Sequence, residues 1–561
     1  MRCAALAITV YLSATSFSQG IWPTRAKQEL VISDSAIASQ VGAEILKKGG
    51  NAVDAAVATG FALAVTFPGA GNIGGGGFML VRMADGRQVA LDFREIAPRA
   101  ASKDMYLDRS GKVIPKASLV GYRAAGVPGT VAGLWEAHHR FGKLPWREVV
   151  EPARKLAAEG FAVSYEFAKT LFGNRTLFSK FPETSRVFSR DGRYFEWGET
   201  FKQPDLAATL GRIRDQGPKD FYEGKTARLI AADMKLHGGL ITLEDLRTYK
   251  VELRQPLTGQ YRDYQVVTMP PPSSGGVALI EMLNILQGYD LKAMGFGSAA
   301  CDHVEVEAMK RAFADRSEYM GDPGFVKVPV AQLIDPAYAA KLRDGISLER
   351  DTPSAGIHPG AGIIKEGDHT THYSVVDKDG NAAATTYTLN TGFGCGVVVK
   401  GAGFFLNDEM DDFASKVGVP NTFGLIQGEA NTIRSGKRPL SSMTPTIVLK
   451  DGKLFMVLGS PGGPTIINTV LQTIINVVDH GMNVQEAVSA PRIHHQWLPD
   501  RISWEPRGLS ADVIRAMEGA GHQFAKPALI GSCHAIMIDP KTGFRFGAVD
   551  PRVEGAGAAG R

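Results

Sequence analysis

A nine-residue stretch at positions 69–77 contains six glycines, and it limits how this chain can fold more than any other segment. It joins an alanine-rich segment with helical spacing, residues 52–65, to an apolar run typical of a strand, residues 78–83. Such a density of glycine indicates either positive φ values or a close approach between backbones. Residues 69–74 also match the G-x-G-x-x-G pattern of dinucleotide sites, but that motif follows a strand and opens a helix, the reverse of the order here. We therefore expect a tightly packed loop rather than a cofactor site.

Periodicity predicts an α/β chain that is mainly helical in its first two thirds. Residues 29–33 have the pattern of a short buried strand, and residues 36–48 show helical spacing that ends at two glycines. The region from about 100 to 345 looks largely helical. Its clearest helical segments are 135–141, 146–156, 226–236 and 304–319.

The last third of the chain is expected to be rich in strands. It follows residues 359–367, a stretch with proline and glycine that we expect to be an exposed linker. Alternating residues around Asp-Gly turns predict two hairpins, one from 371–376 and 383–388 and one from 446–449 and 454–458.

Composition excludes several classes of protein. The 561 residues are 44% hydrophobic and 21% charged, which is close to a globular average and excludes a disordered, collagen-like or coiled-coil chain. The formal net charge is only +4, and the sequence contains no run of basic residues. Nucleic acid is therefore not an expected partner. The four cysteines form no C-x-x-C pair, so we expect neither a disulfide framework nor a metal site.

The first 18 residues have the order of a secretory signal: a short basic start, an apolar segment at 3–12, and small residues with a possible cleavage site at 16–18. The segment is short for a membrane span. A frayed helix is the alternative. We expect residues 1–18 to be removed and the protein to be periplasmic or secreted.

Polar residues gather in the strand-rich last third. A hairpin turn near Asp379 makes Thr370 and Thr388 cross-strand neighbours. Gly462 and Gly463 precede an apolar helical segment, 466–478, so their N–H groups lie at a helix N-terminus and could hold an oxyanion. Threonine pairs on strands usually serve packing, and Gly-Gly before a helix is usually a turn, so neither feature defines an activity alone.

Together the motifs resemble those of the gamma-glutamyltransferase (gamma-glutamyltranspeptidase) family of N-terminal-nucleophile hydrolases, over nearly the whole chain after the signal. They are residues 46–56, 74–80, 91–95, 126–129, 272–276, 369–372, 388–390, 409–412, 438–442 and 459–463.

The resemblance implies a four-layer αββα sandwich, made as a precursor that cuts itself between His369 and Thr370. The products would be a large fragment, 19–369, and a small fragment, 370–561, which remain together as a heterodimer. Thr370 would be the nucleophile, and its freed α-amine, with an unperturbed pKa of about 8, would act as its base. His372 would then have a structural role. No cofactor is implied.

The resemblance also assigns roles to other site residues. Thr388 would orient the Thr370 hydroxyl, and the N–H groups of Gly462 and Gly463 would stabilise the tetrahedral oxyanion. A γ-glutamyl group carries an α-carboxylate and an α-ammonium, so its pocket needs both signs of charge. The expected carboxylate-binding residues are Arg94, Ser441 and Ser442, and the expected ammonium-binding residues are Asn390, Glu409 and Asp412.

The implied activity is cleavage of γ-glutamyl amides such as glutathione, with transfer of the acyl group to water, an amino acid or a peptide. Two alternatives remain. One is a related acylase for glutaryl-type side chains, and the other is an inactive secreted binding protein with the same fold.

Three places depart from the family pattern. Pro464-Thr465 stands where relatives often have Ser-Arg, a difference that bears on the back wall of the pocket. Phe423 lies in an expected lid loop, 417–431, where a tyrosine is commoner. Residues 33–36 depart from the usual histidine-proline pair, without a consequence that the sequence reveals.

Overall fold

The two predicted hairpins lie at the centre of two different sheets in the computed structural model, which describes residues 22–357, 370–416 and 428–561. Sheet I contains the hairpin of β12 (Thr370–Val376) and β13 (Ala382–Thr388), and sheet II the hairpin of β14 (Thr446–Lys450) and β15 (Lys453–Gly459). Each sheet has seven antiparallel strands, in the orders β20-β2-β12-β13-β3-β4-β9 and β1-β19-β18-β15-β14-β11-β10.

The remaining strands come from distant parts of the chain. In sheet I they are β2 (Leu30–Ser33), β3 (Gly76–Arg82), β4 (Gln88–Asp92), β9 (Glu252–Arg254) and β20 (Gly557–Gly560). In sheet II they are β1 (Thr24–Ala26), β10 (Leu257–Tyr261), β11 (Tyr264–Thr268), β18 (His534–Ile538) and β19 (Arg545–Ala548).

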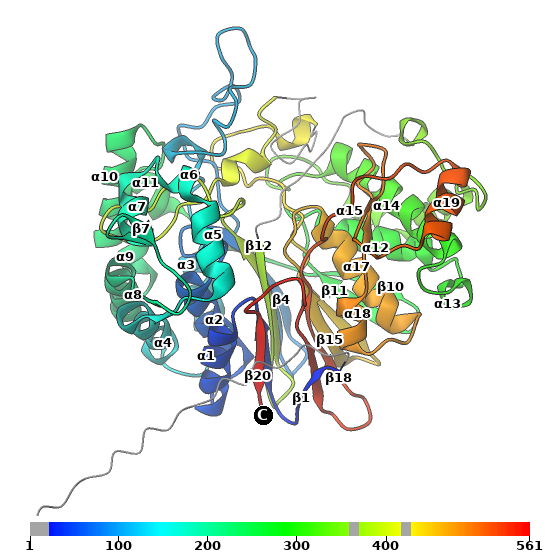
Figure 1. Cartoon of the computed structure of the whole chain (residues 1–561), viewed down its shortest axis with the longest axis horizontal. Helices are drawn as coiled ribbons and strands as arrows, with labels where there is room; N and C mark the ends of the chain where they lie inside the picture. Colours follow the sequence, from blue (N-terminus) through cyan, green and yellow to red (C-terminus); the bar gives the residue numbers. More distant parts are fainter. Residues whose placement is uncertain (1–21, 358–369, 417–427) are drawn as a thin grey trace, which may run out of the picture.

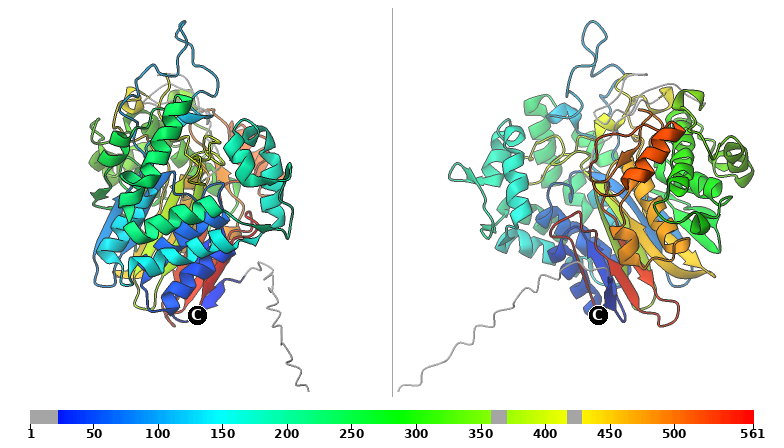
Figure 2. Two further views of the ribbon diagram at one scale, coloured as in Figure 1. Left: turned by 90° about the vertical axis from the view of Figure 1, so that its left-hand side faces the viewer. Right: turned by 45° about the vertical axis from the view of Figure 1, so that its right-hand side comes forward.

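The two sheets pack face to face and helices cover their outer surfaces (Figures 1 and 2). Phe78 and Leu80 of sheet I pack with Ile447 and Val457 of sheet II in one buried apolar cluster between the sheets. Sheet I is covered by α1 (Ala36–Lys47), α2 (Ala52–Thr66), α3 (Thr130–Phe141), α4 (Trp146–Glu159) and α8 (Pro204–Gln216). Sheet II is covered by α12 (Gly275–Leu286), α14 (Ala299–Tyr319), α17 (Thr465–Val478) and α18 (Val484–Ser489). The expected αββα sandwich is confirmed.

Further helices and short strands complete the two halves. The helices are α5 (Tyr165–Gly173), α6 (Arg175–Phe178), α7 (Pro182–Phe188), α9 (Pro218–Tyr222), α10 (Lys225–His237), α11 (Leu243–Thr248), α13 (Leu291–Met294), α15 (Val330–Leu333), α16 (Pro336–Asp344) and α19 (Ala511–Ala520). The strands are β5 (Phe161–Ala162), β6 (Ser189–Arg190), β7 (Arg193–Tyr194), β8 (Thr200–Phe201), β16 (Ile493–His494) and β17 (Ser503–Trp504). Within the described residues, no helix has the length and apolar character needed to cross a membrane.

The glycine-rich stretch packs closely against other backbones, and its glycines do not adopt positive φ. A Cβ on Gly75 would lie 2.0 Å from the Thr388 carbonyl oxygen, and one on Gly74 would lie 2.0 Å from that of Phe405. Strand β3 begins inside the stretch, at Gly76. Of the two explanations for the glycines, close backbone approach is the correct one.

The middle of the chain is less uniformly helical than its periodicity suggests. Residues 252–268 contain β9, β10 and β11, and the last of these pairs with β14 at the centre of sheet II. Only five residues form each of β10 and β11, so they offer too short a pattern to stand out among helices. The expected linker at 359–367 lies outside the described residues.

Candidate active site

A pocket of about 290 Å³ lies where β12 begins and β13 ends, and it gathers nearly all of the predicted site residues. Its lining consists of Arg94, Thr370, Thr388, Asn390, Glu409, Asp412, Ser441, Ser442, Met443, Gly463 and Ile466. Nine of the ten predicted catalytic and substrate-binding residues are among them, and Gly462 is the exception. His369, the other residue of the expected cleavage site, lies outside the described residues.

Thr370 and Thr388 face each other across the hairpin. They are paired in the β12–β13 register, and the Thr370 hydroxyl donates to the Thr388 hydroxyl at 3.4 Å. The Thr388 hydroxyl also accepts from the Asn390 backbone N–H at 2.8 Å. The predicted cross-strand contact is confirmed, and the turn after β13 fixes the Thr388 side chain.

His372 lies deeper on the same face of β12, because side chains alternate along a strand. Its ring nitrogens lie 2.8 Å from the Thr386 hydroxyl and 3.0 Å from the Ser374 hydroxyl. Burial, with a smaller contribution from His534, lowers the pKa of His372 well below its usual value. The ring is therefore neutral and fully engaged in the core, which suits a structural role.

The loop before α17 carries the predicted oxyanion-binding glycines. Gly462 and Gly463 have φ values of 128° and 56°, a region that favours glycine. Thr465 holds this loop, since its N–H and its hydroxyl both donate to the Gly462 carbonyl oxygen, at 3.1 and 2.7 Å. Pro464 and Thr465 do not line the pocket, whereas Ile466 does. The Pro-Thr departure therefore acts on the glycine loop and not on the pocket wall.

Arg94 is the centre of a buried charged cluster. Its side chain is 1% exposed and forms ion pairs with Glu409 and Asp412, while Glu95 lies 3.9 Å away. The guanidinium also donates to the Leu440 carbonyl oxygen at 3.0 Å. The residue expected to bind a carboxylate thus contacts two residues expected to bind an ammonium, so the two halves of the predicted head-group site touch.

The cluster has more acidic groups than cations. Burial, which Arg94 only partly offsets, raises the pKa of Glu95 to about 7 and that of Glu409 well above its usual value. Burial by itself would lower the pKa of Arg94, but Glu409, Asp412 and Glu95 outweigh it and the net shift is upward. One guanidinium therefore faces three carboxyl groups, and this arrangement attracts either a proton or a second cation.

A second arginine supports the serine side of the pocket. The Ser442 hydroxyl accepts from Arg316 of α14 at 2.8 Å, and the same guanidinium donates to the Ser274 hydroxyl at 2.8 Å. Ser274 in turn donates to the Ser441 carbonyl oxygen at 2.8 Å. Glu95 and Arg316 were missed by the sequence reasoning. The signal for Glu95 was its position next to Arg94. The signal for Arg316 was that it is one of several charged residues on a helix, α14, that proves to be buried.

The acidic side of the pocket is held by the turn η3 (Glu409–Asp412). Asn390, with a φ of 78°, donates through its side chain to the Asp408 carbonyl oxygen at 3.0 Å. Asn431 donates to the Asp412 carbonyl oxygen at 2.6 Å, and accepts from the Leu440 N–H at 3.1 Å. Asn431 ends the expected lid segment, of which residues 417–427, with Phe423, lie outside the described residues. The end of that segment is thus joined to both sides of the pocket.

Comparison with known proteins finds relatives that match most of the chain. The gamma-glutamyltranspeptidase family model matches residues 38–560. The glutathione hydrolase proenzyme of Escherichia coli K12 is 51% identical over 532 residues, which cover 94% of this chain and 91% of that protein.

Acylases are similar too. The Acylase ACY 1 proenzyme of Pseudomonas sp. strain V22 is 39% identical, covering 96% of this chain and 94% of that protein. The crystal structure of cephalosporin acylase from Bacillus halodurans superimposes with a TM-score of 0.86 at 27% identity, covering 99% of both chains. The family match over most of the chain and the pocket built on Thr370 lead to one assignment: the chain belongs to the gamma-glutamyltranspeptidase family.

Proposed function

We propose that this protein is a gamma-glutamyltransferase and glutathione hydrolase that works through a γ-glutamyl ester of Thr370. The observation that carries the proposal is that one pocket holds both the Thr370–Thr388 hydroxyl pair and the buried cluster of Arg94 with its carboxylates. The first supplies a nucleophile, and the second suits a head group that carries both an α-carboxylate and an α-ammonium.

Maturation would use the same hydroxyl. Thr370 Oγ1 attacks the His369 carbonyl carbon, the acyl group moves from nitrogen to oxygen, and water hydrolyses the resulting ester. This releases residues 19–369 with a new carboxylate and residues 370–561 with a free Thr370 amine. Support comes from the position of Thr370 as the first residue of β12, and from the relatives, which are named proenzymes. The two fragments would stay together because both contribute strands to each sheet.

In the mature enzyme the Thr370 amine would take the proton of the Thr370 hydroxyl as its oxygen attacks the γ-carbonyl. Thr388 would orient that hydroxyl, and the Gly462 and Gly463 N–H groups would stabilise the oxyanion. The proton would then pass to the leaving amine. Water or an amino acid would attack the ester by the same steps in reverse order and regenerate Thr370.

Recognition would divide the head group between the two halves of the charged cluster. The residues proposed for the α-carboxylate are Arg94, Ser441 and Ser442, and those for the α-ammonium are Asn390, Glu409 and Asp412. Arg94 already pairs with Glu409 and Asp412. A bound zwitterion would add its carboxylate beside Arg94 and its ammonium beside the acidic residues, so the net charge of the cluster would not change. An acyl group without the amine would add only a negative charge and leave the surplus carboxyl groups uncompensated.

This difference separates the proposed activity from a glutaryl acylase. A glutaryl group lacks only the α-amine, so a pocket with three carboxyl groups around one arginine favours the γ-glutamyl compound. The test is to compare kcat/KM for γ-glutamyl and glutaryl p-nitroanilides with the purified enzyme. We expect strong preference for the γ-glutamyl compound, whereas equal turnover would replace this proposal with the acylase.

The same preparation distinguishes an enzyme from an inactive binding protein. Two bands on a denaturing gel, the smaller beginning at Thr370, together with turnover are expected. A single uncut chain without turnover would favour the binding protein.

We also propose export to the periplasm or beyond the cell, directed by residues 1–18. In protein from its own host, the large fragment should begin between Gln19 and Gln28. A fragment that retains Met1 would contradict export by this segment.

A further inference from the structure

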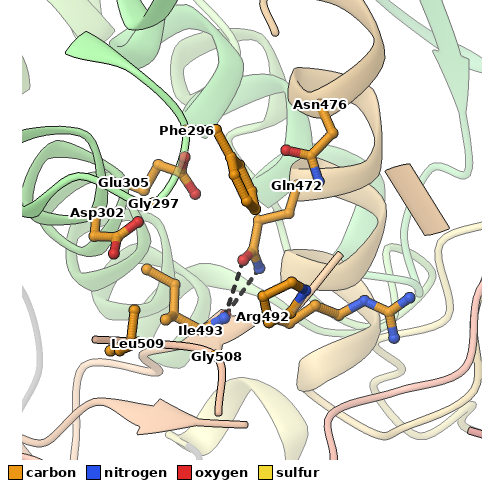
Figure 3. Close-up of a pocket in the computed structure, with 11 residues that line it drawn as sticks. Phe296, Gly297, Asp302, Glu305, Gln472, Asn476, Arg492, Ile493, Gly508 and Leu509 are labelled. Carbon is orange, nitrogen blue, oxygen red and sulfur yellow. Dashed lines mark hydrogen bonds between the residues drawn. The ribbon is translucent and has the colours of Figure 1, made fainter. Parts of the chain in front are cut away.

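A second pocket lies on the other side of sheet II, between α14 and α17, and the proposed reaction does not use it (Figure 3). Asp302 and Glu305 of α14 reach it from one side, and Gln472 and Asn476 of α17 from the other. Both acidic side chains belong to residues that are 6% exposed. The Asp302 Oδ2 atom is buried there and has no hydrogen-bond partner within the described part of the chain.

Glu305 also belongs to a cluster of three metal-ligating side chains. Cys301 and Glu305 lie four residues apart on one face of α14, and His480 follows the end of α17. The Cys301 Sγ atom lies 3.5 Å from Glu305 Oε1 and 3.9 Å from His480 Nε2. Ligand atoms from all three residues lie within 4.8 Å of one another.

These separations suit a tetrahedral ion. With Zn–S near 2.3 Å and Zn–N or Zn–O near 2.0 Å, neighbouring ligand atoms of a tetrahedral zinc ion are about 3.3–3.6 Å apart. Small side-chain rotations would bring the observed atoms to those separations. The Phe296 ring packs edge-on against His480, with ring centroids 5.7 Å apart, and it also lines the pocket between α14 and α17.

The charges of the cluster also call for a cation. Among the residues that the structure describes, no lysine or arginine forms an ion pair with Asp302 or Glu305, and Arg492, which also lines the pocket, pairs with Asp550. A buried carboxyl group in this position needs either a proton or a nearby positive charge, and a bound metal ion would supply the second.

A second cluster of possible metal ligands shows how lysine and arginine side chains can balance buried acidic groups. Glu307, Asp351 and His522 also bring three possible ligand atoms together. There, Lys310 pairs with both Glu307 and Asp351, and Arg311 pairs with Glu307. The fixed cations already occupy the position that a metal ion would take, so this second cluster is a structural ion-pair network.

We propose that Cys301, Glu305 and His480 bind one thiophilic divalent cation of the zinc type, with a water molecule from the adjoining pocket as the fourth ligand. Binding would exchange the Cys301 thiol proton for a metal–sulfur bond and release that proton to solvent. Asp302, with its unpartnered oxygen on the same pocket, would accept a hydrogen bond from the water. This proposal is independent of the proposed enzyme activity.

The test uses the processed protein with both fragments present, after dialysis against a chelator. Titration with zinc chloride and elemental analysis should find one ion per pair of large and small fragments. Cobalt(II) should give a near-ultraviolet sulfur-to-cobalt charge-transfer band, which carboxylates of the catalytic pocket cannot produce. C301S should abolish this band, and C301S and H480Q should each weaken zinc binding more than about 10-fold.

C395S is the matched control, because Cys395 is another buried free cysteine and its thiol lies against the Leu406 carbonyl oxygen. It should keep both the band and the affinity. His480 is half-buried, so H480Q remains a fair test if C301S fails to fold. Absence of bound zinc, or zinc binding that is unchanged in H480Q, would overturn the proposal.

Discussion

The hydroxyl groups of Thr370 and Thr388 lie 3.4 Å apart because the two residues pair directly across the β12–β13 hairpin. The contact follows from the strand register, which places the two side chains opposite each other. It joins the proposed nucleophile to a residue whose own position is fixed by the Asn390 N–H.

Removing the Thr370 hydroxyl should stop both maturation and turnover. T370A should fold but remain a single uncut chain without activity, because one oxygen serves both reactions. T370S should still cut, more slowly, since a hydroxyl remains. Gel analysis over time and N-terminal sequencing would check this, and normal cutting in T370A would contradict the assignment.

Removing the Thr388 hydroxyl should reduce the rate rather than substrate affinity. T388V keeps the shape of the side chain but loses the oxygen that accepts from the Asn390 N–H. We expect kcat to fall on the order of 100-fold, with KM little changed. T388S, which retains the oxygen, is the control. Equal kcat in T388V and the unmodified enzyme would show that this contact is not used.

Neutralising Asp412 should reduce discrimination between acyl groups. D412N loses the ion pair with Arg94 and one negative charge, while Glu409 remains. We expect kcat/KM for a γ-glutamyl anilide to fall on the order of 100-fold and that for the glutaryl anilide to change less.

D411N is the matched control for D412N. Asp411 is the adjacent acid, but its carboxylate accepts from Ser118 and does not line the pocket. An unchanged ratio of the two substrates in D412N, or the same change in D411N, would contradict the proposed ammonium site.

Ligand binding should strengthen with pH through the ionisation of Glu95. Its pKa is raised from 4.5 to about 7, mainly by burial, so the carboxyl group is neutral below that pH and negative above it. A ligand ammonium gains attraction from the negative form, so the affinity for L-glutamate should rise between pH 6 and 8, with proton release. Calorimetry in two buffers of different ionisation enthalpy would measure this.

The raised pKa of Glu95 also predicts how the free energy of unfolding changes with pH. A carboxyl group with a raised pKa binds more protons in the folded than in the unfolded state between pH 4.5 and about 7, so it lowers the free energy of unfolding as pH rises through that window. E95Q should flatten both the binding and the stability profile. Unchanged profiles would place the titration elsewhere.

Adding a single methyl group to the glycine-rich stretch should be destabilising. G75A would place a Cβ 2.0 Å from the Thr388 carbonyl oxygen, so either β3 or β13 must move. We expect a loss of about 3 kcal/mol or more in unfolding free energy, with impaired maturation because Thr388 shifts. G173A, at an open helical position with nothing within 4 Å, should be neutral or slightly stabilising. Similar thermal stability of the two variants would contradict this account of the stretch.

Local sequence was sufficient for the elements and for the contacts between neighbours along the chain. The Asp-Gly turn sets the register of β12 and β13, and so places Thr370 opposite Thr388. Helical spacing located α1, α2 and α17 to within about two residues, because the period of the buried face is a short-range property. The family motifs named the charged residues that line the pocket, but not Glu95 or Arg316, and not how these residues meet.

Only the tertiary structure decided which distant residues touch. Arg94 and Asp412 are 318 residues apart, and Cys301 and His480 are 179 apart; each pair meets because packed helices and sheets bring separate segments together. The same packing buries Glu95 beside Arg94 and, among the described residues, leaves the Asp302 Oδ2 atom without a hydrogen-bond partner. Periodicity and spacing indicate which face of an element is buried. The partner across that face is fixed by long-range packing. The charge of a buried group depends on that partner.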